Sequence, residues 1–301
     1  MAQALKLGLR DLPSLMLLIL VRAIRSVGNL RANADALRRV WQVAVEKRDL
    51  VKALIQRQLR VAHAGRGLGL FWQFFHPLFI VVVYMVIFGA VIGRRLGPMG
   101  DLPGSYSSYI LAGLVPWLIT QNAMAQATGA LTGNENLVKQ VIFPIEVLPF
   151  ATTSVAAITY APALMIVLLH AMVLGVGLTP TLLVLPLLLA LHFTLILGIA
   201  FALSSVTVFV RDIREVINVF SVVALYLMPV IYVPAWMPSI LKPIIYLNPF
   251  SYLIWAYQDV LFFDEFQHPF AWAVLAIMAI GSLAVGARIF AKLKPYYGNA
   301  L

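Results

Sequence analysis

The sequence contains no cysteine, so neither a disulfide framework nor thiolate ligands for a metal can be present. Charge is also scarce, because Asp, Glu, Lys and Arg make up only 11% of the 301 residues, against about a quarter in ordinary globular proteins. Hydrophobic residues make up 62%, and the mean hydropathy is +0.92. A soluble domain cannot bury this much apolar surface, so the composition predicts an all-α membrane protein that crosses the bilayer several times.

The signatures of catalysis are missing as well. The sequence has no Gly-x-x-x-x-Gly-Lys-[Ser/Thr] loop, so it is not expected to hold the phosphates of ATP by that route. His268 near Asp264 and Glu265 is a weak metal signal, more typical of a solvated outer loop. We therefore expect no catalytic residue, metal site or cofactor in this chain. The net charge of +10 would suggest nucleic-acid binding in a soluble protein. In a membrane protein, the positions of the basic residues along the chain matter more, because they indicate which loops face the cytosol.

Six stretches are candidates to cross a bilayer, which takes about 20 apolar residues. They are residues 71–92, 106–131, 147–176, 181–210, 216–233 and 270–290. The first five contain no Asp, Glu, Lys or Arg, and the sixth contains only Arg288 near its end. Ion-coupled transporters usually keep ionisable groups inside the membrane. His76, His170 and His192 are the titratable candidates in these spans, and a lone membrane histidine is more often a packed side chain than a proton relay.

Basic residues are unevenly distributed between the two sides of the predicted membrane domain. With the N-terminus in the cytosol, all but three of the 22 Lys and Arg residues fall on cytosolic segments, and only Arg94, Arg95 and Lys242 lie outside. The excess of positive charge on cytosolic loops therefore predicts a multi-pass protein with both termini in the cytosol. Residues 1–48 are basic and weakly amphipathic, and we interpret them as a cytosolic extension that precedes a membrane domain at residues 49–301.

Residues 49–63 are more clearly amphipathic than residues 1–48. Apolar side chains occupy one helical face and basic ones the other, and Gly65 follows as a stop. A basic amphipathic helix before a membrane span is typical of an interfacial helix on anionic headgroups. It could equally form the wall of a groove for a protein partner, and the sequence leaves both interpretations open.

A short polar stretch, residues 134–150, separates two long apolar runs. Leu137, Val138, Val141 and Ile142 recur at helical spacing on one face. Asn134 or Asn136 can cap a helix here, and Pro144 should stop it. This predicts a small cytosolic helix at residues 134–143. So short a helix is marginal alone, which suggests that it packs against something and passes force between a soluble partner and the spans.

Between the fifth and sixth spans, residues 235–263 are apolar and aromatic but are broken by Pro238, Pro243 and Pro249. The pieces are too short to cross the membrane, so we expect two short helices that dip into the outer leaflet. Aromatic side chains suited to the headgroup level recur here, namely Trp236, Tyr246, Tyr252, Trp255 and Tyr257.

Residues 137–149, Leu-Val-Lys-Gln-Val-Ile-Phe-Pro-Ile-Glu-Val-Leu-Pro, resemble the cytosolic loop motif of the ABC-2 type polysaccharide export permeases, the membrane subunits of O-antigen and teichoic-acid exporters. Residues 49–77, 209–216 and 229–249 resemble further parts of the same family. The resemblance extends over about residues 49–292, and residues 1–48 have no counterpart. His76 departs from the small polar or aromatic residue expected before Pro77.

The resemblance implies a half-transporter in a bacterial inner membrane. Two copies would pair to enclose a pathway for a lipid-linked polysaccharide, with membrane lipids around them. Two copies of a separate subunit would bind ATP and Mg²⁺ and drive the transport. The residues implied in coupling to the ATPase are Asn134, Glu135, Leu137, Val138, Val141, Ile142, Phe143, Pro144 and Glu146. Cytosolic support is expected from Arg57, Arg60, Arg211 and Asp212, although an adjacent Arg-Asp pair is commonly only a loop salt bridge. The outer helices with Trp236, Tyr246, Tyr252 and Trp255 would form a gate.

A polysaccharide path needs contacts that are weak enough to release the chain, and aromatic faces offer such contacts to sugars. The candidate channel residues are Tyr84, Phe88, Tyr106, Tyr109, Trp117, Gln121, Asn122, Tyr226 and Tyr232. The alternative for each aromatic residue is a belt that faces lipid, whereas the amides of the second span favour a protein or water-facing side.

Other functions stay open at this point. O-antigen is the expected cargo, and capsular polysaccharide, teichoic acid or a drug would use the same machinery. A membrane enzyme acting on lipid-linked sugars is a more distant alternative, for which His63, Asp259 and Asp264 are the candidate catalytic residues.

Overall fold

The computed structural model describes residues 35, 38, 40, 42, 45–61, 71–88, 104–140, 143–174, 180–234, 237–240 and 242–301. The regular structure in this part of the chain is helical throughout. The longer helices are α3 (Arg48–Val61), α4 (Phe71–Tyr84), α6 (Tyr106–Thr128), α8 (Val147–Leu174), α9 (Leu185–Thr207), α10 (Ile213–Tyr226), α12 (Phe250–Gln258) and α13 (Pro269–Leu293). The shorter elements are η4 (Thr132–Asn134), α7 (Glu135–Val138), η5 (Pro180–Val184), α11 (Lys242–Leu247), a π-helical turn (Asp259–Phe263), η8 (Lys294–Tyr296) and α14 (Tyr297–Ala300).

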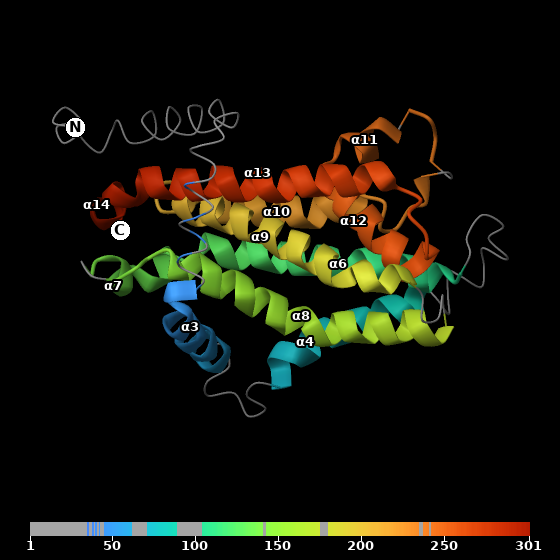
Figure 1. The fold of residues 1–301 in the computed structure, drawn as a ribbon, viewed down its shortest axis with the longest axis horizontal. Helices are drawn as coiled ribbons and strands as arrows, with labels where there is room; N and C mark the ends of the chain where they lie inside the picture. The colour runs from blue at the N-terminus through green and yellow to red at the C-terminus, as the bar shows by residue number, and fades with distance from the viewer. Residues whose placement is uncertain are drawn as a thin grey trace.

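The long helices lie side by side along the long axis of the molecule (Figure 1). Helices α7 and α14 are at one end of this bundle, and α11 and the C-terminal part of α12 are at the other. We refer to these as the α7 end and the α11 end. The amphipathic helix α3 lies across the outside of the bundle and packs against α8.

Four of the described helical segments are long and apolar enough to cross a membrane: Phe71–Phe88, Val147–Met172, Pro180–Thr207 and Pro269–Ala300. Each coincides with a predicted span. The other two predicted spans correspond to α6 and α10, which do not reach the same combination of length and hydropathy. Polar side chains such as Gln121, Asn122 and Gln126 lower the hydropathy of α6. Helix α10 has only 14 residues, and it ends at Tyr226, well before the predicted limit of 233, because Pro229 cannot continue it.

Helices α9 and α13 form the closest helix pair, and two glycines make this approach possible. A Cβ atom on Gly198 would lie 2.3 Å from the backbone nitrogen of Leu283. A Cβ atom on Gly286 would overlap the carbonyl oxygen of Gly198. Small residues that let helix backbones touch are the usual basis of tight packing in membrane bundles, and Gly198 and Gly286 have this role in the pair α9 and α13.

Two main hydrophobic clusters fill the described bundle. The larger one joins α6, α8, α9, α12 and α13, and its largest fully buried side chains include Trp117, Tyr109 and Tyr257. The second lies at the α7 end and includes Val138, Phe201, Phe290 and Tyr297, together with Val51 and Leu54 of α3. The apolar face predicted for residues 49–63 is therefore the face that packs in α3, whose first turn contains Asp49.

Candidate functional site

The α7 segment differs from the helix predicted at residues 134–143. After the 3₁₀ turn η4, α7 has only four residues and ends at Val138, and Lys139 is already a turn residue. Asn134 does not cap it with its side chain, because its Nδ2 instead donates to the carbonyl oxygen of Ala130 at 3.0 Å. Val141 and Ile142 lie outside the described residues, and Phe143 and Pro144 are half-buried coil.

Burial divides this segment into anchoring and exposed side chains. Val138 and Ile145 are buried in the cluster at the α7 end and hold the loop against the bundle. Asn136, Lys139 and Gln140 are exposed, while Glu135, Leu137 and Glu146 are intermediate. A short loop pinned at two apolar points, with polar side chains facing outward, is suited to contact a soluble partner.

The C-terminal elements complete this surface. Glu146 accepts a hydrogen bond from Lys294 Nζ at 2.5 Å, which joins the start of α8 to η8. A surface cavity of about 660 Å³ lies between residues 138–145 and residues 291–299. Glu146 therefore lies beside the C-terminal helices. The sequence did not predict this contact, because Lys294 is only one of several basic residues near the end of the chain.

A second cavity lies where α3, α4, α6 and α8 meet. Its volume is about 550 Å³. The predicted site residues Arg57, Asn122 and Asn134 all line it, which brings together positions from the support, channel and coupling sets. Trp72, Gln73, His76, Gln126, Thr159 and Tyr160 also contribute to the wall. This combination was missed from the sequence, because its residues come from four separate segments.

Hydrogen bonds fix part of the cavity wall. Gln73 on α4 is buried and donates from Nε2 to Thr159 Oγ1 on α8 at 2.8 Å. On α6, Gln126 Nε2 donates to Asn122 Oδ1 at 2.5 Å. The exposed Arg57 supplies a positive charge from α3, whereas the nearby Arg60 is exposed but does not line the cavity. The site can therefore offer amide donors and one guanidinium to an anionic or hydroxyl-rich ligand.

The remaining support residues, Arg211 and Asp212, are exposed in the turn before α10. The neighbouring Arg214 lies close to the end of α6, since a Cβ atom on Gly129 would be 3.0 Å from its Nη2 atom. The turn before α10 is therefore near the loop that leads into α7, and a supporting role for Arg211 and Asp212 stays a prediction.

The candidate channel aromatics fall into two groups. Tyr109 and Trp117 are at most 1% exposed, and Tyr106 is also buried, so these three pack inside the described protein. The half-buried Tyr84 stacks on Phe88 with ring centroids 5.4 Å apart. The partly exposed group thus comprises Tyr84, Phe88, Tyr226 and Tyr232, with the half-buried Gln121 on α6.

At the α11 end, the two expected short helices are α11 and α12. Trp255 is buried, and its ring lies 5.1 Å from that of Tyr246 and 5.3 Å from that of Tyr252. The Tyr252 hydroxyl donates to the Tyr246 carbonyl oxygen at 2.8 Å. Three of the four proposed gate residues are thus gathered in one aromatic cluster, and Trp236 lies outside the described residues.

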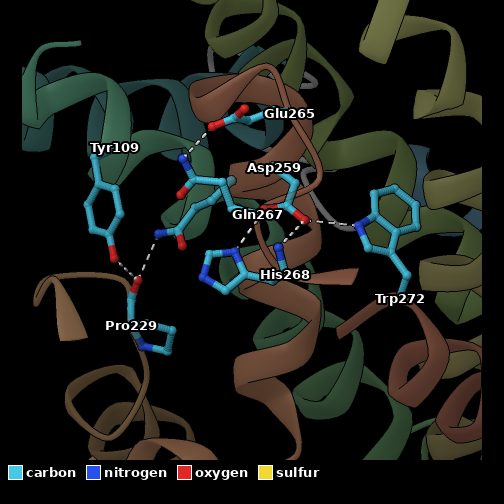
Figure 2. Close-up of polar contacts among 8 residues, drawn as sticks. Tyr109, Pro229, Asp259, Glu265, Gln267, His268 and Trp272 are labelled. Carbon is cyan, nitrogen blue, oxygen red and sulfur yellow. Dashed lines mark hydrogen bonds and ion pairs between the residues drawn. The ribbon is translucent and has the colours of Figure 1, made fainter. Parts of the chain in front are cut away.

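The carboxylates considered for an enzyme are engaged in structural contacts. Asp259 is 1% exposed and is hydrogen bonded to His268 and Trp272 (Figure 2). Asp264 accepts a hydrogen bond from Thr181 Oγ1 at 2.5 Å. Neither carboxylate lines the two cavities described above. His63 lies outside the described residues.

An all-helical bundle with several helices able to cross a bilayer, covered at one end by an amphipathic helix, defines a membrane protein. Residues 49–262 match the ABC-2 type transporter family, so the chain belongs to this family. The O-antigen export system permease protein RfbA of Myxococcus xanthus is 24% identical to it over 235 residues, which is 77% of this chain and 87% of the relative. A protein of the same name from Klebsiella pneumoniae is 22% identical over 256 residues, or 84% of this chain and 95% of the relative. The family predicted from residues 137–149 is thereby confirmed.

Proposed function

We propose that this chain is the transmembrane subunit of an ATP-binding cassette exporter that moves a lipid-linked polysaccharide, O-antigen, across the bacterial inner membrane. The observation that carries the proposal is the agreement between the family match and the relatives named as O-antigen export permeases, which the chain covers over most of their length. The alternative cargoes for the same machinery are capsular polysaccharide, teichoic acid and drugs. A transport assay with each substrate distinguishes them from O-antigen.

In this proposal the chain has no nucleotide site of its own. Two copies of a separate subunit bind ATP and Mg²⁺ and press on the α7 end. The support for this division is the α7 segment, whose exposed Asn136, Lys139 and Gln140 face away from the bundle while Val138 and Ile145 anchor it. A movement of the α7 segment is thereby transmitted to the start of α8 and the end of α6.

Two copies of the chain enclose the path. The centre of the described bundle is filled by Trp117, Tyr109 and Tyr257, each at most 1% exposed, so a polysaccharide cannot pass through the middle of one protomer in this state. A path between protomers leaves this packing intact and offers the sugar the exposed residues of α10, among them Tyr226. Each protomer contributes six spans, with α6 and α10 as the second and fifth, and both termini in the cytosol.

The polar cavity between α3, α4, α6 and α8 receives the phosphate group that joins the glycan to its lipid. It lies beside the amphipathic helix, where an interfacial helix meets the first span, and its wall combines Arg57 with amide groups of α4 and α6. Arginine is well suited to phosphate because its planar guanidinium donates two parallel hydrogen bonds.

This assignment predicts that Arg57→Glu lowers export of a polyprenyl-diphosphate-linked glycan in proteoliposomes by about tenfold or more, because charge reversal repels the phosphate and removes its bidentate donor. The matched control is Arg60→Glu, the same change one turn away on the same helix but outside the cavity. It should leave export within about twofold, since exposed single charges contribute little. Equal effects of the two substitutions would contradict a role for the cavity and favour a general effect of charge on α3.

A further inference from the structure

Three consecutive polar residues, Tyr257, Gln258 and Asp259, stand at the point where α12 becomes the π-helical turn. All three are at most 1% exposed. Successive side chains on a helix point about 100° apart, so three neighbours can be buried together only where the helix is surrounded. Each of the three is hydrogen bonded to a different part of the molecule, and we call them the polar anchor.

Tyr257 joins α12 to α9 and α6 through a histidine. Its hydroxyl lies 2.9 Å from His192 Nδ1, and His192 Nε2 lies 2.9 Å from Thr120 Oγ1. Because the Thr120 hydroxyl donates to the Pro116 carbonyl oxygen at 2.9 Å, it accepts from His192 Nε2–H, which leaves Nδ1 to accept from Tyr257. The chain of donors is complete with a neutral imidazole, so the buried His192 needs no charge.

Gln258 joins α12 to the connection between α10 and α11. Its Nε2 donates to the Pro229 carbonyl oxygen at 2.7 Å, and the Tyr109 hydroxyl of α6 donates to the same oxygen at 3.1 Å (Figure 2). Tyr109 also contacts the carbonyl oxygen of Tyr232 at 3.1 Å. The segment between α10 and α11 is therefore held from both α12 and α6.

Asp259 joins the π-helical turn to the start of α13. Its Oδ1 lies 2.8 Å from His268 Nδ1, and its Oδ2 accepts from Trp272 Nε1 at 3.0 Å and from the His268 backbone N–H at 3.2 Å (Figure 2). The carboxylate side chain is fully enclosed. A buried carboxylate is costly unless hydrogen bonds satisfy it, so these donors fix its position.

Helix α6 connects the polar anchor to the α7 end. It carries Tyr109, which shares the Pro229 carbonyl oxygen with Gln258, and Thr120, which reaches Tyr257 through His192. It ends at Thr128, shortly before η4 and α7. A helix of 23 residues is a rod of about 35 Å. Pro116 lies within this helix between Tyr109 and Thr120, whereas the part from Thr120 to Thr128 contains no proline. A displacement of the α7 loop therefore reaches the anchor most directly through Thr120 and His192.

We infer that Tyr257, Gln258 and Asp259 form a positioning site, which fixes the outer helices α11 and α12 to α6, α9 and α13 so that they move as one body when the α7 end is displaced. The inference that this movement opens the export path rests on the proposed function. The outer helices are thus carried by the bundle and do not swing as an independent flap.

The test uses Asp259→Ala in the complex with its ATPase in lipid nanodiscs and proteoliposomes. Three quantities are measured: ATP hydrolysis, transport of a fluorescent polyprenyl-diphosphate-linked glycan, and amide hydrogen exchange over residues 242–263. We expect exchange protection and transport each to fall about tenfold or more, because the His268 and Trp272 donors lose their acceptor. ATP hydrolysis should stay within about twofold, since the α7 end is unchanged.

His268→Asn and His268→Ala provide the matched pair. The amide nitrogen of asparagine occupies the position of His268 Nδ1 and retains the N–H donor toward Asp259, so transport and exchange should stay within about threefold of the wild-type protein, whereas alanine should behave like Asp259→Ala. Tyr257→Phe removes one hydroxyl without changing the shape, and it should also raise exchange in α12.

Several results would overturn the inference. Normal transport and exchange in Asp259→Ala would show that the anchor fixes nothing. A parallel loss of transport, ATP hydrolysis and assembly, with no rescue by asparagine at 268, would reduce the site to ordinary fold stability. If the wild-type complex moves no glycan, the proposed function fails, and the exchange measurement alone then decides whether the anchor holds the outer helices.

Discussion

Gly286→Leu should prevent the chain from reaching its native packing. The Cβ atom of any side chain at this position would overlap the carbonyl oxygen of Gly198 on α9, and that obstacle is backbone, which cannot turn away as a side chain could. Overpacking of this kind costs about 3 kcal/mol or more, which for a domain of this size corresponds to a lowering of the melting temperature by about 10 °C. The measurement is thermal unfolding of the purified chain in detergent, together with its yield from membranes.

The control lies on the same helix. Gly281→Ala places a methyl group where no described atom lies within 4 Å, and alanine favours a helix interior over glycine by up to about 1 kcal/mol. Its melting temperature should therefore equal or exceed that of the wild-type protein. If Gly286→Leu melts like Gly281→Ala, then α9 and α13 do not approach each other as closely as the structure indicates.

Lys139→Glu should detach or uncouple the ATPase while the permease itself folds normally. Lys139 is exposed and forms an i,i+4 pair with Glu135, with both side chains nearly half exposed, so the reversal changes stability by less than about 1 kcal/mol. It does change the charge of the surface that we assign to the partner. The expected result is a fall of about tenfold or more in the ATPase recovered with the tagged chain and in ATP-driven export.

Lys242→Glu is the corresponding change at the α11 end, on the first residue of α11 and far from α7 (Figure 1). It should retain the partner and support export. Normal recovery of the ATPase with Lys139→Glu, or equal loss with both variants, would count against a docking surface at the α7 segment.

The sequence predicts best those helices that bury only one face, because their apolar residues then recur on that face alone. The amphipathic stretch at residues 49–63 has one apolar face, and α3 buries Val51 and Leu54 of that face. The α7 helix was predicted too long, because the helical spacing of Leu137 and Val138 with Val141 and Ile142 indicated a continuing helix. In the structure Val138 is drawn into the hydrophobic cluster at the α7 end, and the chain leaves the helix at the next residue.

Burial inside a membrane bundle is harder to predict, since both the lipid-facing and the core-facing sides of a span are apolar. Tyr109 and Trp117 were candidates for the channel from their position in the second span, yet the fold packs both of them inside one protomer. The hydrogen bonds that join Thr120, His192 and Tyr257 were equally impossible to predict from the sequence. The His192 partners Thr120 and Tyr257 are 72 and 65 residues away, so no local spacing connects them.

In the proposed function, the chain is a passive path whose energy comes from a separate ATPase that acts at the α7 end. The direct test is transport of a polyprenyl-diphosphate-linked glycan in proteoliposomes that contain this chain alone or with its ATPase. We predict ATP-dependent transport only with both subunits present, and no ATP hydrolysis by this chain alone. ATP hydrolysis by the isolated chain, or glycan transport driven by a proton gradient without the partner, would contradict the claim.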